Sequence, residues 1–133
     1  MTRQDINNLS IADQMELIRQ DTRYIAYIDF PNKELQLYTL KRNPKAFRLI
    51  KNPCIEAQII AVKHSPDAIR YILKPSREVQ LALVKSCSCG IIFIENPTRE
   101  VQMMAVRRNK QALNYTSSID INHSITKIFN QSM

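Results

Sequence analysis

The chain has 133 residues, of which 44% are hydrophobic, with a formal net charge of +7 and a pI near 9.5. This length suits one domain, and the apolar fraction is too high for a disordered chain. A single glycine excludes a glycine-rich phosphate loop, and three cysteines do not make an even disulfide framework. No apolar run reaches the roughly 18 residues of a transmembrane helix, and the polar start Met-Thr-Arg-Gln-Asp predicts a cytoplasmic protein. The excess of basic over acidic residues favours an acidic partner, either nucleic acid or an acidic protein surface.

A repeat of 22 residues organises most of the chain. Residues 75–84 read Pro-Ser-Arg-Glu-Val-Gln-Leu-Ala-Leu-Val, and residues 97–106 have the same pattern 22 positions later. When the columns are numbered from this proline, column 4 is glutamate and column 6 is glutamine at 31–40 and 53–62 as well. Four copies in one register predict stacked supersecondary units. The repeats cover about 9–30, 31–52, 53–74, 75–96 and 97–118, and residues 119–133 are expected to form a C-terminal cap.

Each repeat of this single domain is expected to contain two helices. The first spans columns 1 to 11, with the proline at the first helical position and Asn52 or Asn96 as the cap before it. Glutamate in column 4 and a base in column 11 suit the two ends of the helix dipole. Columns 7 and 10 are apolar in all five copies, which marks the buried side of this helix.

The second, shorter helix is expected over columns 14 to 20. Columns 17 and 20 are apolar, column 16 is small from the second repeat onward, and column 19 carries large side chains that we place in the core. The β-branched segment Ile91–Ile94 allows a strand, but the helical spacing of the other copies favours a helix. Helices of this length need neighbours to be stable. The pattern therefore predicts an all-α chain, a right-handed α-solenoid of about five 22-residue two-helix repeats with degenerate terminal caps.

The units Asn-Pro-Thr-Arg-Glu-Val-Gln-Met-Met-Ala-Val and Lys-Pro-Ser-Arg-Glu-Val-Gln-Leu-Ala-Leu-Val resemble the short two-helix repeats of leucine-rich-repeat-variant and HEAT-like proteins. The resemblance covers about residues 9–116, and similar repeats occur in many small phage and bacterial proteins. It implies an α-solenoid used for binding, without a shared catalytic residue. The iron–sulfur cysteine cluster that precedes some leucine-rich-repeat-variant arrays has no counterpart, because no cysteine precedes Cys54. The 22-residue period is also shorter than that of typical HEAT units.

The glutamine of column 6 is expected within the apolar face of the first helix, because columns 9 and 10 lie within about 60° of it. This column comprises Gln14, Gln36, Gln58, Gln80 and Gln102. One interpretation is a structural ladder in which each amide bonds to the backbone of its own or the next repeat. The other is a row of glutamines that reads a polar partner in a groove. A repeated buried polar residue can fix register, which favours the ladder.

Basic residues form the main candidate binding surface. Column 11 is Arg or Lys in every copy, which is either a phosphate-binding stripe or a solvated Glu/Lys face with favourable helix-end charges. A denser cluster lies in the second repeat, where no acid occurs between Glu34 and Glu56. The candidate basic edge comprises Arg23, Lys41, Arg42, Lys45, Arg48, Lys51, Arg70, Arg107 and Arg108. Such an edge suits nucleic acid or an acidic protein, and an ordinary solvated surface is the alternative.

The sequence shows no arrangement of residues that is typical of a catalytic or metal-binding site. The two histidines have no neighbouring nucleophile motif, so we expect no enzyme. Cys87-Ser-Cys89 lacks the paired ligands that a tetrahedral metal site needs, so neither metal nor another cofactor is expected.

We therefore expect a non-enzymatic binding protein whose partner is another protein, by analogy with a phage-encoded adaptor or inhibitor acting on a host complex. Its apolar contacts would be the column 8 residues Tyr38, Ile60 and Met104. The alternative is a nucleic-acid-binding module that holds phosphates along the basic edge, although few aromatic side chains are placed for stacking on single strands. No membrane contact is expected. The sequence leaves the oligomeric state open.

Overall fold

The computed structural model describes residues 1–110. The chain divides into two compact units, Met1–His64 and Ser65–Met133. Every regular element in residues 1–110 is helical, so the all-α prediction is confirmed. The predicted cap at 119–133 and the second helix of the last repeat lie outside the described residues.

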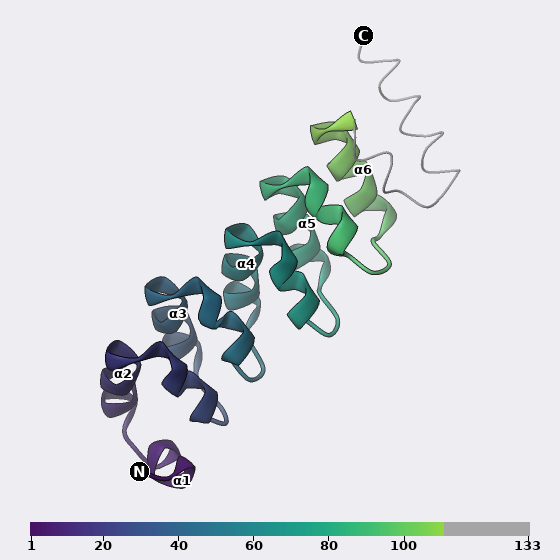
Figure 1. Ribbon diagram of the computed structural model, residues 1–133. Coiled ribbons are helices and arrows are strands. Elements are labelled where there is room, and N and C mark those ends of the chain that lie inside the picture. The colour runs from purple at the N-terminus through teal and green to yellow at the C-terminus, as the bar shows by residue number, and fades with distance from the viewer. Residues whose placement is uncertain (111–133) are drawn as a thin grey trace. The chain divides into compact units, whose positions relative to one another are not determined.

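From α2 onward, α-helices and 3-10 helices alternate along the described chain and are joined by short loops (Figure 1). The first unit contains α1 (Arg3–Asn7), α2 (Ile11–Gln20), η1 (Thr22–Tyr27), α3 (Lys33–Arg42), η2 (Pro44–Leu49) and α4 (Ile55–His64). The second unit contains η3 (Pro66–Tyr71), α5 (Arg77–Ser86), η4 (Ser88–Phe93) and α6 (Arg99–Arg108). Helices α2 to α6 all occupy columns 3 to 12, and η1 to η4 all occupy columns 14 to 19. The sequence period is therefore also the structural period.

The prolines of column 1 do not begin the α-helices, contrary to the prediction. Helices α3, α5 and α6 begin two residues later, and column 2 supplies their caps. Asn32, Ser76 and Thr98 each accept a hydrogen bond from the backbone N–H three residues further on. Asn52 and Asn96 are not caps, since their φ angles of 52° and 88° place them in the left-handed region. Asparagine tolerates that region better than most residues, so these two positions turn the chain before the proline.

The second helix of each repeat is a 3-10 helix and ends one residue earlier than predicted. Its hydrogen bonds span three residues, as from the N–H of Ile50 to the carbonyl of Phe47 at 3.1 Å. Pro44 and Pro66 begin η2 and η3, where a missing N–H leaves no bond unmade. The helical interpretation of Ile91–Ile94 is confirmed, because residues up to Phe93 belong to η4.

The core of each unit lies between its α-helices and its 3-10 helices. In the first unit α2 packs on α3 and α3 on α4, and in the second α5 packs on α6. The largest fully buried side chains are Ile18, Ile25, Leu35, Leu40 and Val62 in the first unit and Val79, Leu83, Val84, Ile91, Val101 and Val106 in the second. Column 19 does not belong to the core, contrary to the prediction, since Tyr27 is 49% exposed and Tyr71 60%. A 3-10 helix has three residues per turn, so columns 17 and 20 share a face and column 19 points away from it.

Helix α1 covers the N-terminal end of the first unit. Ile6 is 3% exposed and precedes the column 20 residue of the first repeat by one 22-residue period. Its carbonyl accepts a hydrogen bond from Gln14 Nε2 at 2.9 Å. Asn7 donates to the Tyr27 carbonyl and accepts from the Asp29 N–H, both at 2.8 Å. Helix α1 thus takes the place that the second helix of a preceding repeat would hold, and it covers the apolar face of the first repeat.

Candidate functional site

From the second repeat onward, the column 6 glutamines bond to the backbone at the start of their own repeat. The Nε2 atoms of Gln36, Gln58, Gln80 and Gln102 each donate to the carbonyl of the column 1 proline at 2.9 to 3.0 Å. The Oε1 atom of Gln36 also accepts the N–H of Cys54 in the next repeat at 2.8 Å. The Oε1 atoms of Gln80 and Gln102 are buried without a hydrogen-bond partner. These amides point into the fold, so they do not form a surface for a partner.

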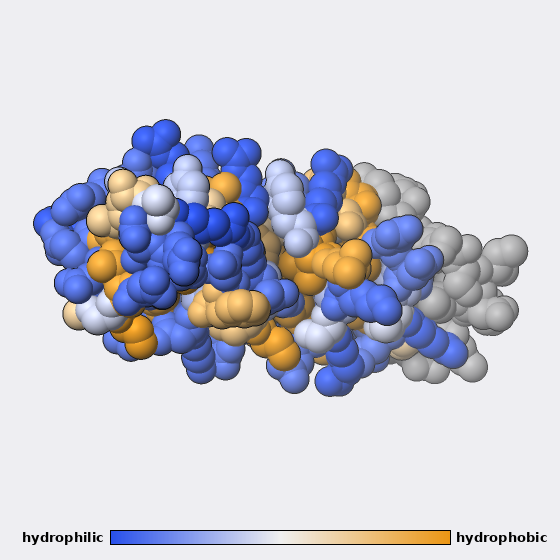
Figure 2. Space-filling model, turned by 90° about the horizontal axis from the view of Figure 1, so that it is seen from below, coloured by the Kyte–Doolittle hydropathy of each residue, from blue (hydrophilic) through white to orange (hydrophobic). Residues whose placement is uncertain are grey.

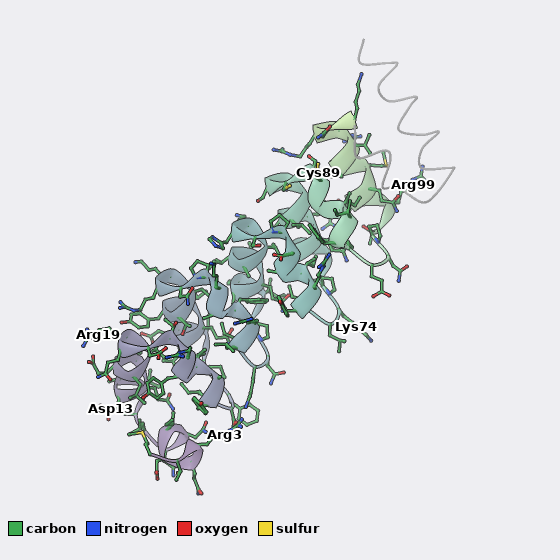
Figure 3. The ribbon with its side chains drawn as sticks, in the orientation of Figure 1. Arg3, Asp13, Arg19, Lys74, Cys89 and Arg99 are labelled. Atoms are coloured by element: carbon green, nitrogen blue, oxygen red, sulfur yellow. The ribbon has the colours of Figure 1, made fainter. Side chains whose placement is uncertain are left out.

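In the first unit, the ends of α2 and α3 carry a high density of bases. Residues 19–23 run from the last turn of α2 into η1, and residues 41–45 run from the last turn of α3 into η2. We call these two connections the turn edge. Its bases are Arg19, Arg23, Lys41, Arg42 and Lys45. All of them are exposed, and Figure 3 shows Arg19 at the end of α2. The column 4 glutamates lie near the opposite ends of the α-helices, which are about 15 Å long.

The two connections of the turn edge border an open hollow of about 890 Å³. It is lined by Arg19, Gln20, Asp21, Thr22, Tyr38, Lys41, Arg42 and Asn43. The guanidinium of Arg42 lies 5.6 Å from the centroid of the Tyr38 ring and donates to the carbonyl of Arg19 at 3.1 Å. These two contacts hold Arg42 of α3 against the end of α2.

The carboxylates at and beside the turn edge are already paired. Arg19 binds Glu16 through Nε at 2.9 Å and Nη2 at 2.6 Å, and Arg23 binds Asp21 through Nη2 at 2.6 Å. The hydrogen bonds from these arginines lower the pKa of the Glu16 and Asp21 carboxyls, so both acids are charged at neutral pH. Lys41 and Lys45, in contrast, have no carboxylate partner within residues 1–110.

Two of the four column 4 glutamates, Glu56 and Glu100, pair with the neighbouring repeat. In the first unit, Lys33 of α3 lies 2.9 Å from Glu56 of α4. In the second, Arg77 of α5 donates to Glu100 of α6 at 2.6 Å. Both pairs are exposed and add little to stability. Their basic partners come from column 3, so these glutamates do not neutralise Lys41 in column 11.

Three residues of the predicted basic cluster, Lys45, Arg48 and Lys51, do not line the hollow. Lys51 follows η2 and pairs with Asp29 at 3.1 Å. Residues 46–50 separate Lys51 from Lys45, the last residue of the turn edge, and all but one of them belong to η2. Arg48 lies on η2 itself, is exposed, and has no carboxylate partner in the part of the chain that the structure describes. The predicted cluster is therefore spread along η2, and only its first part borders the hollow.

The second unit carries the remaining basic candidates. The guanidinium of Arg70 lies 4.7 Å from the centroid of the Phe93 ring on η4, which is a cation–π contact. Arg107 and Arg108 are exposed at the end of α6, where positive charge suits the helix dipole. Each of these residues has a structural interpretation that needs no ligand.

Exposed apolar side chains are scattered over the molecule. Of the predicted column 8 contacts, Ile60 is 39% exposed, and Tyr38 and Met104 are half-buried. Phe30 is 86% exposed and Leu73 94%. They were not singled out from the sequence, although polar or charged residues fill their columns in the other repeats and indicate an exposed position. Figure 2 shows small apolar patches among hydrophilic side chains on one face. The polar lining residues Thr22 and Asn43 were also missed, since only the folded chain places them in one hollow with Arg42.

No group of His, Cys, Asp and Glu side chains within residues 1–110 is arranged to hold a metal ion. Cys54, Cys87 and Cys89 are free thiols. No helix in that same range has the length and apolar character needed to cross a membrane.

No family model matches the chain, and no curated protein or solved structure is significantly similar to it. The turn edge and its hollow are thus the features from which a function can be inferred.

Proposed function

We propose that this protein is a non-enzymatic binding protein that holds an acidic segment of another protein against the turn edge of its first unit. An adaptor or inhibitor acts in this way, since it needs a shaped surface and no reacting groups. The charge imbalance of the turn edge supports the proposal. Lys41 and Lys45 are exposed and lack carboxylate partners among the described residues. They also lie in a stretch with no acid between Glu34 and Glu56.

Three observations favour a protein partner over nucleic acid. Glu16 and Asp21 interrupt the row of bases, and their charges would repel a continuous phosphate backbone. One face of the Tyr38 ring is covered by Arg42, so this ring is poorly placed to stack on a base. Ile60 of α4, in the same repeat column as Tyr38, is 39% exposed and offers an apolar side chain to the centre of a protein interface.

We also propose that the repeats form a right-handed α-solenoid, as the repeat pattern predicts. Two observations support this form: successive α-helices pack on one another within each unit, and all five have the same column bounds. A solenoid suits a binding protein, because each repeat contacts its neighbours and the stack offers an extended surface.

Binding to two polyanions of equal charge tests the function. The full chain is titrated into a fluorescent oligoglutamate peptide and, separately, into a fluorescent single-stranded DNA oligonucleotide with the same number of charges. The substitutions Lys41→Gln and Lys45→Gln together should weaken peptide binding about tenfold, because two unpaired charges leave the turn edge. The matched control, Lys33→Gln with Lys74→Gln, also removes two lysines and should change the affinity less than about twofold. Equal losses in the two variants, or no peptide binding, would contradict the proposal.

The second candidate is a nucleic-acid-binding module. It is favoured by the exposed base in the last turn of each helix from α2 to α6, namely Arg19, Lys41, Lys63, Lys85 and Arg107. The DNA complex should then weaken steeply with salt, with a log–log slope of about −0.7 for each phosphate contacted on a single strand. A flat salt response, or DNA binding weaker than peptide binding, would exclude this candidate.

A further inference from the structure

We infer that the hollow between the ends of α2 and α3 is a carboxylate-binding site that receives an acidic side chain of the partner segment. The inference rests on the proposed function and assigns the part of the turn edge that recognises the acid. The hydrogen bonds of the lining, its net charge and the fixed position of Arg42 carry it.

The acceptor groups of the lining are largely occupied. The carboxylate of Asp21 is held by Arg23, through Nε at 3.0 to 3.1 Å and Nη2 at 2.6 Å. The side-chain oxygen of Asn43 accepts the N–H of Lys45 at 3.1 Å. The hydroxyl oxygen of Thr22 accepts from the amide of Asn43 at 3.2 Å. A ligand rich in donors would therefore find few acceptors.

Donors, in contrast, remain available. The ammonium of Lys41 has no hydrogen-bonding partner within the described part of the chain. Arg42 uses one N–H on the carbonyl of Arg19 and has four others, because a guanidinium carries about five donors. The hydroxyl of Thr22 accepts a hydrogen bond and so keeps its own hydrogen to donate. Two cationic donors and one neutral donor therefore line the hollow, which suits a group that only accepts, such as a carboxylate or a phosphate.

The charge balance of the hollow also favours an anion. Three positive side chains, Arg19, Lys41 and Arg42, face one negative side chain, Asp21, which gives a net charge of +2. The C-terminal ends of α2 and α3 each add about −0.5, so the lining stays positive by about one charge. Charges just outside the lining, on Glu16 and Arg23, cancel each other.

Arg42 is held in place before a ligand arrives. Its contacts with the Tyr38 ring and the Arg19 carbonyl fix the guanidinium between two helices. Less side-chain freedom is then lost on binding, which favours a specific contact over diffuse charge attraction. Separate carboxylates on a peptide can enter this hollow while avoiding Glu16 and Asp21, whereas a continuous phosphate backbone must pass them.

The test compares two charge-matched double variants of the full chain, with oligoglutamate as the probe. The hollow variant, Lys41→Gln with Arg42→Gln, should bind about tenfold more weakly, because it loses two charge-assisted donors. The control, Lys74→Gln with Arg48→Gln, also loses one lysine and one arginine, but both residues lie outside the turn edge and neither lines the hollow. Its affinity should fall by about threefold or less, as expected for a change in long-range charge.

A third variant separates hydrogen bonding from charge. Thr22→Val keeps the shape and the charge but removes the hydroxyl donor, so binding should weaken about threefold. Equal losses in both double variants, with no effect of Thr22→Val, would overturn the carboxylate site and leave the proposed function intact. No binding of oligoglutamate to the unmodified chain would overturn both. Loss of DNA binding alone in the hollow variant would show that the occupant is a phosphate and overturn the inference.

Discussion

Gly90 allows a close contact between η4 and α5, and replacing it with alanine tests the packing of the second unit. A Cβ atom at this position would lie 2.8 Å from Cδ1 and 3.0 Å from Cγ of Leu83, and 3.4 Å from Cβ of Pro66. The φ angle of Gly90 is not positive, so alanine suits the backbone and only the contact opposes it. Leu83 is fully buried and has no route into solvent. In this repeat, the large column 9 residue Leu83 therefore fits against the smallest possible column 16 residue, Gly90.

The expected loss of unfolding free energy for Gly90→Ala is about 1–2 kcal/mol. Overpacking a core costs about 1–3 kcal/mol, and the lower backbone entropy of alanine in the unfolded chain offsets up to about 1 kcal/mol of it. Leu83→Ala alone should cost about 2–5 kcal/mol, because it opens a cavity. In the double variant the new methyl group occupies part of that cavity. The combined loss should therefore be at least 1 kcal/mol or so smaller than the sum of the single losses.

The assay is urea unfolding of the four proteins, the original chain, the two single variants and the double variant, followed by far-ultraviolet circular dichroism. Additive losses, within about 0.5 kcal/mol, would show that the two side chains do not compete for space. A gain in stability from Gly90→Ala alone would show that Leu83 moves aside freely. Either result would refute the steric reasoning.

Three further predictions concern the backbone and surface charges. Gln36→Met should cost about 2–4 kcal/mol of unfolding free energy, because the buried carbonyl of Pro31 and the half-buried N–H of Cys54 lose their partner. Gln80→Met should stay within about 1 kcal/mol, because only the carbonyl of Pro75 loses a partner and the Oε1 of Gln80 is already unpaired. Asn52 has a left-handed φ, which glycine adopts easily and a β-branched residue does not. In urea unfolding, Asn52→Gly should leave the free energy of unfolding nearly unchanged, and Asn52→Val should lower it by about 1–3 kcal/mol. The hydrogen bond from Arg77 lowers the pKa of Glu100 below its ordinary 4.5, so this pair stabilises the fold above that pH and the benefit is lost as the pH falls through the lowered value. A carboxyl NMR titration should find the pKa of Glu100 restored to its ordinary value by Arg77→Gln, and an unchanged value would contradict the pairing.

The helical pattern of this chain could be predicted from sequence because it depends on local order. Apolar residues recur at helical spacing inside each repeat, and the α-helices accordingly begin at Ile11, Lys33, Ile55, Arg77 and Arg99, one period apart. The placement of glutamine within the apolar face follows from the rotation of 100° per residue, and four of the five glutamines are buried. The starts of α3, α5 and α6 were predicted two residues too early from the sequence. In a sequence, a proline that precedes an Asn, Ser or Thr cap cannot be told from a proline at the first helical position.

The candidate site depended on tertiary structure. The sequence predicted a dense basic cluster from 41 to 51, but only the fold shows that Lys51 pairs with Asp29 and that Arg42 reaches the Arg19 carbonyl. Only the folded structure also shows that the second helices are 3-10 helices, in which Tyr27 points outward. Contacts between residues more than twenty positions apart depend on the offset between neighbouring helices, and no local propensity encodes that offset. The repeat could therefore be predicted from the order of the residues. The ion pairs, and with them the hollow, could be identified only in the tertiary structure, because they depend on how neighbouring helices pack.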